Sequence, residues 1–380
     1  MKDWKAELCT ALSSPIEAPP LQELVSGAGL VLVLVPDFTS RIPLAQVLEP
    51  LVKSLEETGI DRHRLGMIVA LGTHGALADE ELEELVGRDI YKRFPVLNHD
   101  WRNDDAMVTV ARLPDGTRVR VNDMIKDADV LIGVGQIRPH RISGYSGGAD
   151  VILPGISGPA VLGWIHWVSA HRPSKEFTCV ADNPIRHAME KAARGAGLDF
   201  IVNLIMNSDG EVAAVFAGDP VAAHREGVRR AEKIYPGGSG EPFDIVVALS
   251  SSEPDLWRAA SGVYEGSLWV RDGGRIILGA PCPRGVSTEH PEVLKTGYLP
   301  LEEVKARVQN GNMEDLVLAA HLAHVGQIHY GQAEITLVSE GVAEEETAKL
   351  GLSCALDLQS AVDEAFGQLG EDASLAVYGH

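Results

Sequence analysis

The sequence predicts an α/β protein of two domains with mostly parallel, Rossmann-like sheets. Two observations support this prediction. Short, continuous apolar runs, typical of strands buried on both faces of a sheet, alternate with stretches of helical periodicity. This alternation favours a parallel sheet covered by helices. The chain of 380 residues is also longer than a single hydrophobic core usually accommodates, which indicates two domains.

The expected elements of the first domain alternate along the chain. Helical periodicity marks three stretches, 43–59, 78–87 and 183–197. Asp79 and Asn183 are expected to cap the second and the third of these helices at their N-termini. Buried strands are expected in the apolar runs between and around these helices: 29–36, 66–72, 129–135, 177–182 and 200–206.

A polar segment rich in glycine and proline, YPGGSGEP (235–242), is the expected linker. After it the strand pattern restarts at 243–251, 273–282 and 333–341, which indicates a second α/β domain. The predicted domains therefore cover residues 1–238 and 239–380. The tail 373–380 could supply a last strand to either of them.

Composition excludes several classes of protein. The formal net charge is -21, and no run of lysine or arginine could neutralise phosphates, so nucleic acid is not an expected partner. The four cysteines lie far apart, without a C-x-x-C motif, as in a protein with reduced thiols. No signal-peptide pattern and no run of about 18 apolar residues occurs. We therefore expect a cytoplasmic protein without a membrane span.

Polar residues follow four of the predicted strands. They are Asp37 to Arg41, Thr73-His74, Asn98-His99 and Pro139-His140. Ligands of open parallel sheets bind outside the carboxyl ends of the strands. A single histidine there is most often a hydrogen-bonded core or loop residue, but three at successive strand ends favour a functional site. His166, between two tryptophans in GWIHW, is typical of a packed core histidine and becomes a candidate metal ligand beside such a site.

Residues 144–148, GYSGG, match the G-x-S-x-G pattern, which would make Ser146 a nucleophile. That motif needs a strand before it and a helix after it, whereas here the strand-like run 151–155 follows. Closely spaced glycines instead favour a loop whose N–H groups face an anion, with a plain turn as the alternative. His321 and His324 lie one helical turn apart but lack a carboxylate partner in register, so we leave them out of the site.

Together these motifs resemble the nickel-pincer-nucleotide lactate racemase family of 2-hydroxyacid racemases and epimerases. The resemblance spans most of the chain, including LGAPCPRGVS (278–287) in the second domain, and the combination is more specific than any single motif. In the first domain it rests on DFTSRIP (37–43), LGTH (71–74), NH (98–99), PH (139–140), SGYSGGADVILPG (143–155) and His166.

The resemblance implies an enzyme with its active site in the cleft between two α/β domains. It implies a nickel ion held in pyridinium-3,5-bisthiocarboxylate mononucleotide, with His166 as the protein ligand of the metal and His74 and His140 as the acid/base pair. It also implies enzymes of cofactor biosynthesis as partners, and we expect a monomer or homodimer. The implied cofactor-binding positions are Asp37, Thr39, Ser40, Ser146, Gly147, Gly148 and Asp150, and the implied substrate-binding positions are Arg41, His99 and Arg258.

These roles agree with the chemistry of racemisation. Inverting a carbon that bears a hydroxyl through a planar 2-keto acid moves a hydride off one face and back to the other. A base is needed for each enantiomer, and imidazole suits this task near neutral pH.

Three departures from the family pattern concern the cofactor and the substrate. Asp150 stands where the family has a lysine that tethers the cofactor, which favours non-covalent binding, with loss of the cofactor as the alternative. Ser40 replaces an arginine, with Arg41 one place later. Ser261 replaces a lysine close to Arg258, whose guanidinium could hold a carboxylate. We therefore expect a 2-hydroxy acid other than lactate. The alternatives are a hydrolase using Ser146 and a non-catalytic protein that binds a small molecule or metal.

Overall fold

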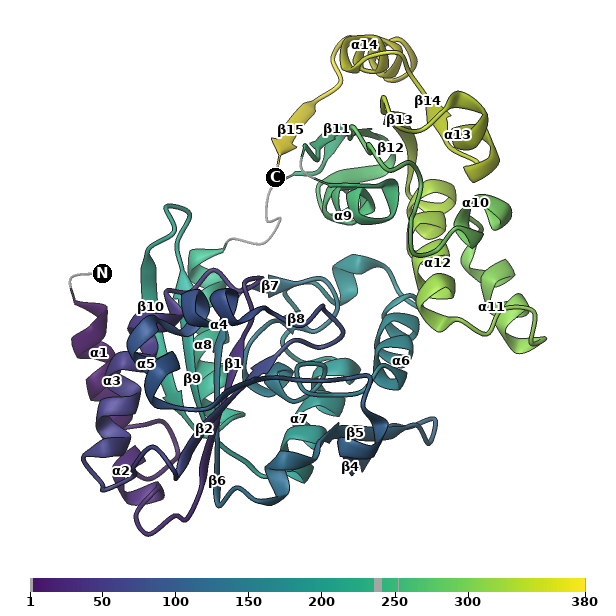
Figure 1. The fold of residues 1–380 in the computed structure, drawn as a ribbon. Coiled ribbons are helices and arrows are strands. Elements are labelled where there is room, and N and C mark those ends of the chain that lie inside the picture. Colours follow the sequence, from purple (N-terminus) through teal and green to yellow (C-terminus); the bar gives the residue numbers. More distant parts are fainter. Residues whose placement is uncertain (1–2, 236–240, 252, 380) are drawn as a thin grey trace. The chain divides into compact units, whose positions relative to one another are not determined.

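The computed structural model describes residues 3–235, 241–251 and 253–379 (Figure 1). The chain forms two compact units, Met1–Leu162 with Thr178–Gly237, and Gly163–Phe177 with Gly238–His380. The expected linker falls largely on residues 236–240, which lie outside the described part of the chain. None of the described helices is long and apolar enough to cross a membrane.

The first unit contains a six-stranded sheet of order β10-β9-β6-β1-β2-β3. All neighbouring strands are parallel except β10, which runs antiparallel to β9. Two small hairpins, β4/β5 and β7/β8, accompany the sheet. The strands are β1 (Val31–Pro36), β2 (Leu65–Ala70), β3 (Val96–Asn98), β4 (Met107–Arg112), β5 (Arg118–Asn122), β6 (Val130–Gln136), β7 (Pro139–His140), β8 (Gly144–Tyr145), β9 (Leu198–Met206) and β10 (Val212–Gly218).

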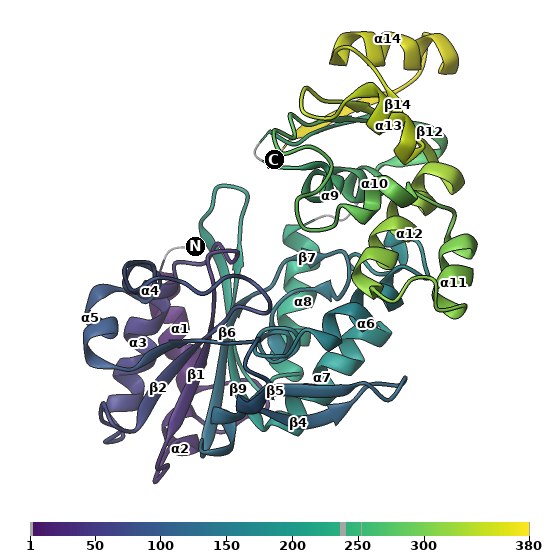
Figure 2. The ribbon, with the colours of Figure 1, turned by 45° about the vertical axis from the view of Figure 1, so that its right-hand side comes forward.

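Helices cover both faces of this sheet. Alternate residues of β9 belong to opposite faces of the sheet. Phe200 belongs to the core cluster that includes the buried face of α3, whereas Ile205 clusters with residues of α8. Figure 2 shows α1 and α3 on one side of the sheet and α7 and α8 on the other. The helices are α1 (Trp4–Ser13), α2 (Leu21–Leu24), α3 (Leu44–Glu56), α4 (Asp79–Val86), α5 (Arg88–Arg93), α7 (Pro184–Ala196) and α8 (Ala222–Ile234), with 3₁₀ turns η1 (Asp104–Ala106), η2 (Asp123–Lys126) and η3 (Gly148–Val151).

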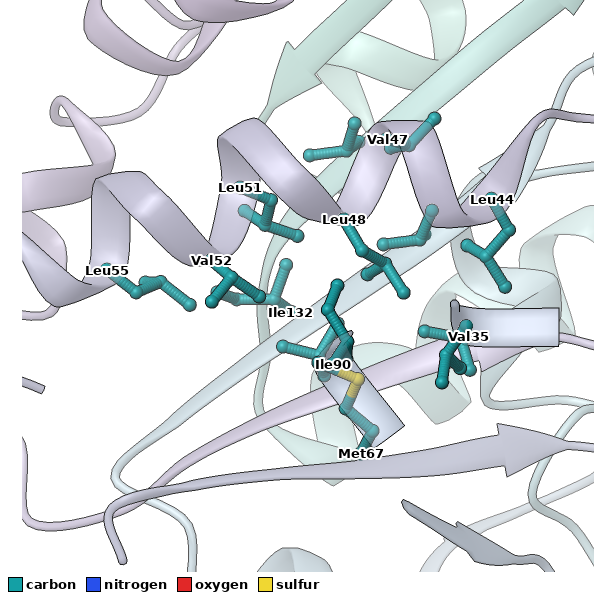
Figure 3. Close-up of a cluster of buried hydrophobic side chains, with 14 of the residues drawn as sticks. Val35, Leu44, Val47, Leu48, Leu51, Val52, Leu55, Met67, Ile90 and Ile132 are labelled. Carbon is teal, nitrogen blue, oxygen red and sulfur yellow. The ribbon is translucent and has the colours of Figure 1, made fainter. Parts of the chain in front are cut away.

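Helix α3 illustrates how the first core forms. Its buried residues recur at helical spacing, which places them on one face of the helix: Leu44, Val47, Leu48, Leu51, Val52 and Leu55. In Figure 3 this face lies over Met67 of β2 and Ile132 of β6. Each fully buried aliphatic side chain contributes roughly 1.5–3 kcal/mol through the hydrophobic effect. The amphipathic pattern of the sequence therefore fixes how this helix packs.

The second unit is a five-stranded parallel sheet of order β14-β13-β12-β11-β15. Helices α9 and α12 pack on one face, and α14 packs on the other. The C-terminal tail supplies β15, which pairs with β11. The strands are β11 (Phe243–Leu249), β12 (Val270–Gly279), β13 (Ala333–Val338), β14 (Ser353–Cys354) and β15 (Leu375–Gly379). The helices are α9 (Leu256–Gly266), α10 (Glu292–Thr296), α11 (Leu301–Gln309), α12 (Leu316–Gly331), α13 (Glu344–Leu350), α14 (Leu358–Leu369) and the turn η4 (Ser174–Glu176).

Helix α6 (Ala160–Ser169) and the loop after it group with the second unit from residue 163 onward, whereas the sequence analysis assigned them to the first domain. Hydrogen bonds join this segment to α12. Nε2 of His324 lies 2.9 Å from Oγ of Ser169, and Nε2 of Gln327 donates to the carbonyl of Ala170 at 2.6 Å.

The α/β class and the mostly parallel sheets are confirmed, but three local expectations are wrong. The apolar runs 177–182 and 151–155 are not strands. The first passes β8 as a loop, where Cys179 N–H donates to the carbonyl of Gly144. The second begins at the last residue of η3 and continues as a turn whose N–H groups bond locally. Asp79 is the first residue of α4, after Ala78 as the N-cap. The cap at Asn183 is confirmed, because its side chain accepts two N–H groups of α7.

Candidate active site

The topology of the first sheet defines where a ligand would bind. The chain leaves β1 for β2 and β3 on one side and then returns to β6 on the other side of β1. Ligands of doubly wound folds bind at such a switch point, outside the carboxyl ends of the strands. The loops that follow β1 and β6 carry the motifs DFTSRIP and PHRISGYSGGAD. Their predicted site residues therefore belong to one edge of the sheet.

Gln136, the last residue of β6, joins these two loops. Its side-chain Oε1 accepts the backbone N–H of Arg41 at 3.0 Å. Its carbonyl accepts the hydroxyl of Ser146 at 2.7 Å. Gln136 is not among the site residues predicted from the sequence. The pattern that could have indicated it is a polar residue that ends an apolar run at a switch point of the sheet.

Asp37 and His74 come from neighbouring strands and form a hydrogen-bonded pair. Oδ2 of Asp37 lies 2.6 Å from Nδ1 of His74, and Oδ1 accepts the N–H of Thr39 at 3.0 Å and its hydroxyl at 2.5 Å. Burial by itself raises the pKa of Asp37, but the bonds from His74 and Thr39 outweigh it and hold the pKa below its ordinary value. The aspartate is therefore ionised near neutral pH.

An ionised Asp37 fixes the tautomer of His74. A carboxylate only accepts, so Nδ1 of His74 must donate. The neutral ring then carries its lone pair on Nε2, which is the form that accepts a proton from a ligand hydroxyl. The side chain of His74 is 59% exposed, whereas that of Asp37 is 9% exposed. The buried acid thus orients an accessible base.

His140 is held in the opposite tautomer. It ends β7, opposite Gly144 of β8. Its Nδ1 accepts the backbone N–H of Ser143 at 3.1 Å, and a backbone N–H can only donate. Neutral His140 therefore carries its proton on Nε2. The hydroxyl of Ser143, 3.0 Å from Nδ1, donates to the carbonyl of Tyr145 and could accept an N–H from Nδ1 in the other tautomer.

Backbone N–H groups of the glycine loop after His140 are hydrogen-bonded to side chains of the protein. Gly147 N–H binds Oδ2 of Asp150 at 2.5 Å, and Gly148 N–H binds Oδ1 of Asn203 at 2.7 Å. The loop lies close to the sheet, since a Cβ added at Gly133 of β6 would come within 2.8 Å of Val151. These N–H groups have protein acceptors, so the loop does not present them to an anion in the way we expected from the sequence.

Ser146 does not have the environment of a nucleophile. Its hydroxyl donates to Gln136 and accepts the N–H of Arg138 at 3.1 Å. The histidine that touches this residue, His224, binds its carbonyl at 2.9 Å instead of its hydroxyl. Nucleophilic serines need a base on the hydroxyl. The described geometry gives the hydrolase alternative no support.

His99 is buried beneath the turn that precedes α6. The residue is 2% exposed, and its Nε2 lies 3.1 Å from the carbonyl of Ser157. Burial lowers its pKa, so the ring is neutral and donates this bond from Nε2. His99 therefore stabilises the turn through Nε2, while its buried Nδ1 has no hydrogen-bond partner among the described residues.

A pocket of about 240 Å³ adjoins Asp37 and the N-terminus of α3. Phe38, Ser40 and Glu84 are among its lining residues. Oγ of Ser40 is buried and has no hydrogen-bond partner among the described residues. Because an unsatisfied buried hydroxyl is costly, this one calls for a partner that a bound group would supply.

In the second unit, His166 lies on α6 and is half-buried. Its carbonyl accepts the hydroxyl of Ser169 at 2.7 Å, and that same hydroxyl lies 2.9 Å from Nε2 of His324. The backbone at His166 is therefore anchored to α12. No group of three or more His, Cys, Asp or Glu side chains in the described ranges is arranged to hold a metal ion.

Arg258 lies on α9, next to a stack of aromatic rings. Trp257 is sandwiched between His290 and His321, with ring centroids 4.1 and 3.8 Å apart. Nδ1 of His321 also lies 2.8 Å from the hydroxyl of Tyr264, whereas Nε2 of His324 lies 2.9 Å from that of Ser169. Arg258 itself is 56% exposed and lies 3.8 Å from Glu289. Because the ion pair between Arg258 and Glu289 is long and exposed to solvent, it is weak, and the guanidinium can also bind the carboxylate of a ligand.

Comparisons with known proteins agree with these features. Residues 1–178 match the lactate racemase N-terminal domain family. A lactate racemase from Thermoanaerobacterium thermosaccharolyticum is 29% identical over 283 residues, or 72% of this chain and 65% of that protein. The match thus spans just under two thirds of that relative. A lactate racemase from Lactiplantibacillus plantarum is 26% identical over 377 residues, or 97% of this chain and 87% of that protein.

Solved structures give the same result. The lactate racemase apoprotein from Thermoanaerobacterium thermosaccharolyticum aligns with a TM-score of 0.83 at 26% identity, over 97% of this chain and 89% of that one. A protein from Thermotoga maritima aligns at a TM-score of 0.74 and 21% identity, over 99% and 98% of the two chains, and shows the fold alone. The first 178 residues thus match the lactate racemase N-terminal domain family, and the whole chain is similar to lactate racemases in sequence and in fold.

Proposed function

We propose that the protein racemises or epimerises a 2-hydroxy acid other than lactate, using a non-covalently bound nickel-pincer nucleotide. The observation that carries this proposal is the pair of histidines, His74 and His140, on loops at one edge of the sheet and in opposite tautomers. Racemisation needs a proton-transferring group for each enantiomer, and two differently held imidazoles meet that need. When bound, the cofactor would accept and return the hydride.

The two histidines start each direction of the reaction differently. His74 accepts the hydroxyl proton of one enantiomer directly at Nε2, and Asp37 stabilises the resulting imidazolium. His140 rests with its proton on Nε2, where it donates a hydrogen bond to the substrate oxygen. To act as a base for the other enantiomer, His140 must lose the Nε2 proton to solvent and take one from solvent at Nδ1, where Ser143 Oγ would replace the backbone N–H of Ser143 as the hydrogen-bond partner.

In the first unit, Ser40 is the residue whose environment best fits a bound nucleotide. Ser40 provides the unsatisfied hydroxyl beside Asp37 and Thr39, and these three would hold the cofactor. We propose His166 as the protein ligand of nickel, since neutral imidazole is a suitable ligand for this metal. Asp150 cannot form a thioamide, and its carboxylate is already bound to Gly147 N–H. Both facts support non-covalent binding.

Arg258 supports a substrate other than lactate. With Ser261 at the position of the family's lysine, this guanidinium is the cation of α9 that could hold the substrate carboxylate. Enzymes of cofactor biosynthesis remain proposed partners. The cytoplasm remains the proposed location, because all four cysteines are free thiols.

The decisive experiment is to produce the protein together with the cofactor-biosynthesis enzymes and to analyse what it carries. We expect stoichiometric nickel and a nucleotide that denaturation releases intact, with the mass of the chain unmodified. A panel of 2-hydroxy acids is then followed by chiral chromatography, with the double variant His74→Ala/His140→Ala as the inactive control. A covalent adduct on the chain would contradict non-covalent binding, and a double variant that still racemises would contradict the acid/base assignment.

A further inference from the structure

Buried side chains hold the turn that follows His140. The guanidinium of Arg186, on α7, donates to the carbonyls of Tyr145 and Gly147, the latter at 2.9 Å. His224, on α8, binds the carbonyl between them, that of Ser146, at 2.9 Å. Arg186 and His224 are each 1% exposed. Three consecutive carbonyls are thus fixed by two side chains beneath the loop.

The charge of Arg186 needs a buried partner. Glu190, one helical turn along α7 and 6% exposed, is already paired with Arg225 at 2.7 Å. Burial raises the pKa of Asp150, whereas the charges of Arg186 and Arg138 lower it, so Asp150 and Arg186 attract each other. Removing one carboxylate leaves an uncompensated buried cation, which is strongly unfavourable.

Asp150 also binds the loop directly, through the N–H of Gly147 at 2.5 Å. Residues 144–147 in turn support His140, because Gly144 pairs with it across β7 and β8 and Ser143 donates to its ring. The fit at Gly144 is close, since a Cβ there would lie 2.0 Å from the carbonyl of Val180. A displacement of this loop would therefore move the imidazole.

We propose that Asp150 is a positioning residue for His140. Its carboxylate balances Arg186, which fixes the carbonyls on either side of Ser146, and it ties down Gly147 N–H from within the same turn. Asp150, which stands where the family has its tethering lysine, thus orders the loop that carries His140. The catalytic part of this statement rests on the proposed function of His140, whereas the orientation of the ring does not.

The test uses the full chain without cofactor and the ring nitrogens of ¹⁵N-labelled histidine. The His140 signals are those that disappear in His140→Gln. We expect the wild-type ring to show an accepting Nδ1 and a protonated Nε2. In Asp150→Asn, which keeps the shape and removes the charge, these signals should shift towards a mixture of tautomers.

Glu190→Gln is the matched control, because it removes the other carboxylate of the same charge cluster without touching the loop. It should lower the melting temperature yet leave the His140 signals in place. Asp150→Asn/Arg186→Gln, which is again balanced in charge, keeps the test usable if the single variant does not fold, and its His140 signals should shift as well. Unchanged His140 signals in the Asp150 variants, or an equal shift in Glu190→Gln, would overturn the proposal.

With cofactor loaded, the Asp150→Asn enzyme should lose kcat by about 10²-fold with KM little changed, as expected for a displaced catalytic group. If the ring signals shift but kcat does not fall, the role proposed for His140 is wrong while the positioning by Asp150 holds. The two failures are therefore distinguishable.

Discussion

Nδ1 of His74 lies 2.6 Å from Oδ2 of Asp37, and this contact fixes which nitrogen of the ring can act as a base. Nδ1 of His140, by contrast, receives the backbone N–H of Ser143 at 3.1 Å. The two imidazoles are thus prepared for opposite roles by groups that the ligand never needs to touch. Four predictions follow from this arrangement and from the contacts around it.

Asp37→Asn should lower kcat by about 10²- to 10⁴-fold, because an amide no longer holds the tautomer of His74 or stabilises its cation. Steady-state rates in both directions measure this effect. Since the pKa of Asp37 lies below its ordinary value, its ionisation should not limit wild-type activity above about pH 4. Asp100→Asn, in a turn where the side chain accepts Arg102 N–H, is the control and should remain active.

His166→Ala should abolish nickel retention while leaving the circular dichroism spectrum unchanged. The reason is that we propose its imidazole as the protein ligand of the metal. His171→Ala is the control, because His171 is exposed just beyond the same helix and its Nδ1 bonds to the carbonyl of Trp167. Metal analysis after gel filtration measures the result. Stoichiometric nickel in His166→Ala would remove this residue from the site.

Arg258→Gln should raise KM for the substrate by roughly 10- to 100-fold, since a charge-assisted hydrogen bond contributes about 1.5–3 kcal/mol. Arg258→Lys should recover only part of this loss, because an ammonium lacks the planar fork. Arg307→Gln, whose arginine pairs with Glu303 on α11, should behave as wild type. Equal KM values for the Arg258 and Arg307 variants would refute carboxylate binding by Arg258.

His224 should make the stability of the first unit depend on pH. Burial and the nearby charge of Arg186 hold its pKa well below the usual value of about 6.5. Below that pH the unfolded chain binds a proton that the folded chain does not, so the free energy of unfolding falls as pH falls, until the folded-state pKa is reached. His224→Gln should remove up to about 1.4 kcal/mol per pH unit from this slope.

Urea unfolding between pH 7 and pH 5 measures the difference between the two slopes. His63→Gln, at an exposed position in the turn before β2, is the control and should keep the slope of the wild type. Parallel curves for His224→Gln and the wild type would mean that His224 does not remain neutral in the folded protein.

The sequence by itself determined the alternation of buried strands and amphipathic helices, because hydrophobic periodicity is a local property. It gave α3 its apolar face, capped α7 with Asn183, and put His74 and His140 beyond the ends of β2 and β6. It could not distinguish a buried loop from a strand in 151–155 or 177–182, since both are continuous apolar runs.

Only the tertiary structure decided which groups are already engaged. Gly148 N–H is bound by Asn203, 55 positions away in the chain, and the carbonyl of Ser146 by His224, 78 positions away. Arg186 could have been noticed from the sequence only as a charge on the apolar face of α7. Hydrogen bonds and tautomers depend on the distances between residues that folding brings together, and no local pattern of the sequence records them.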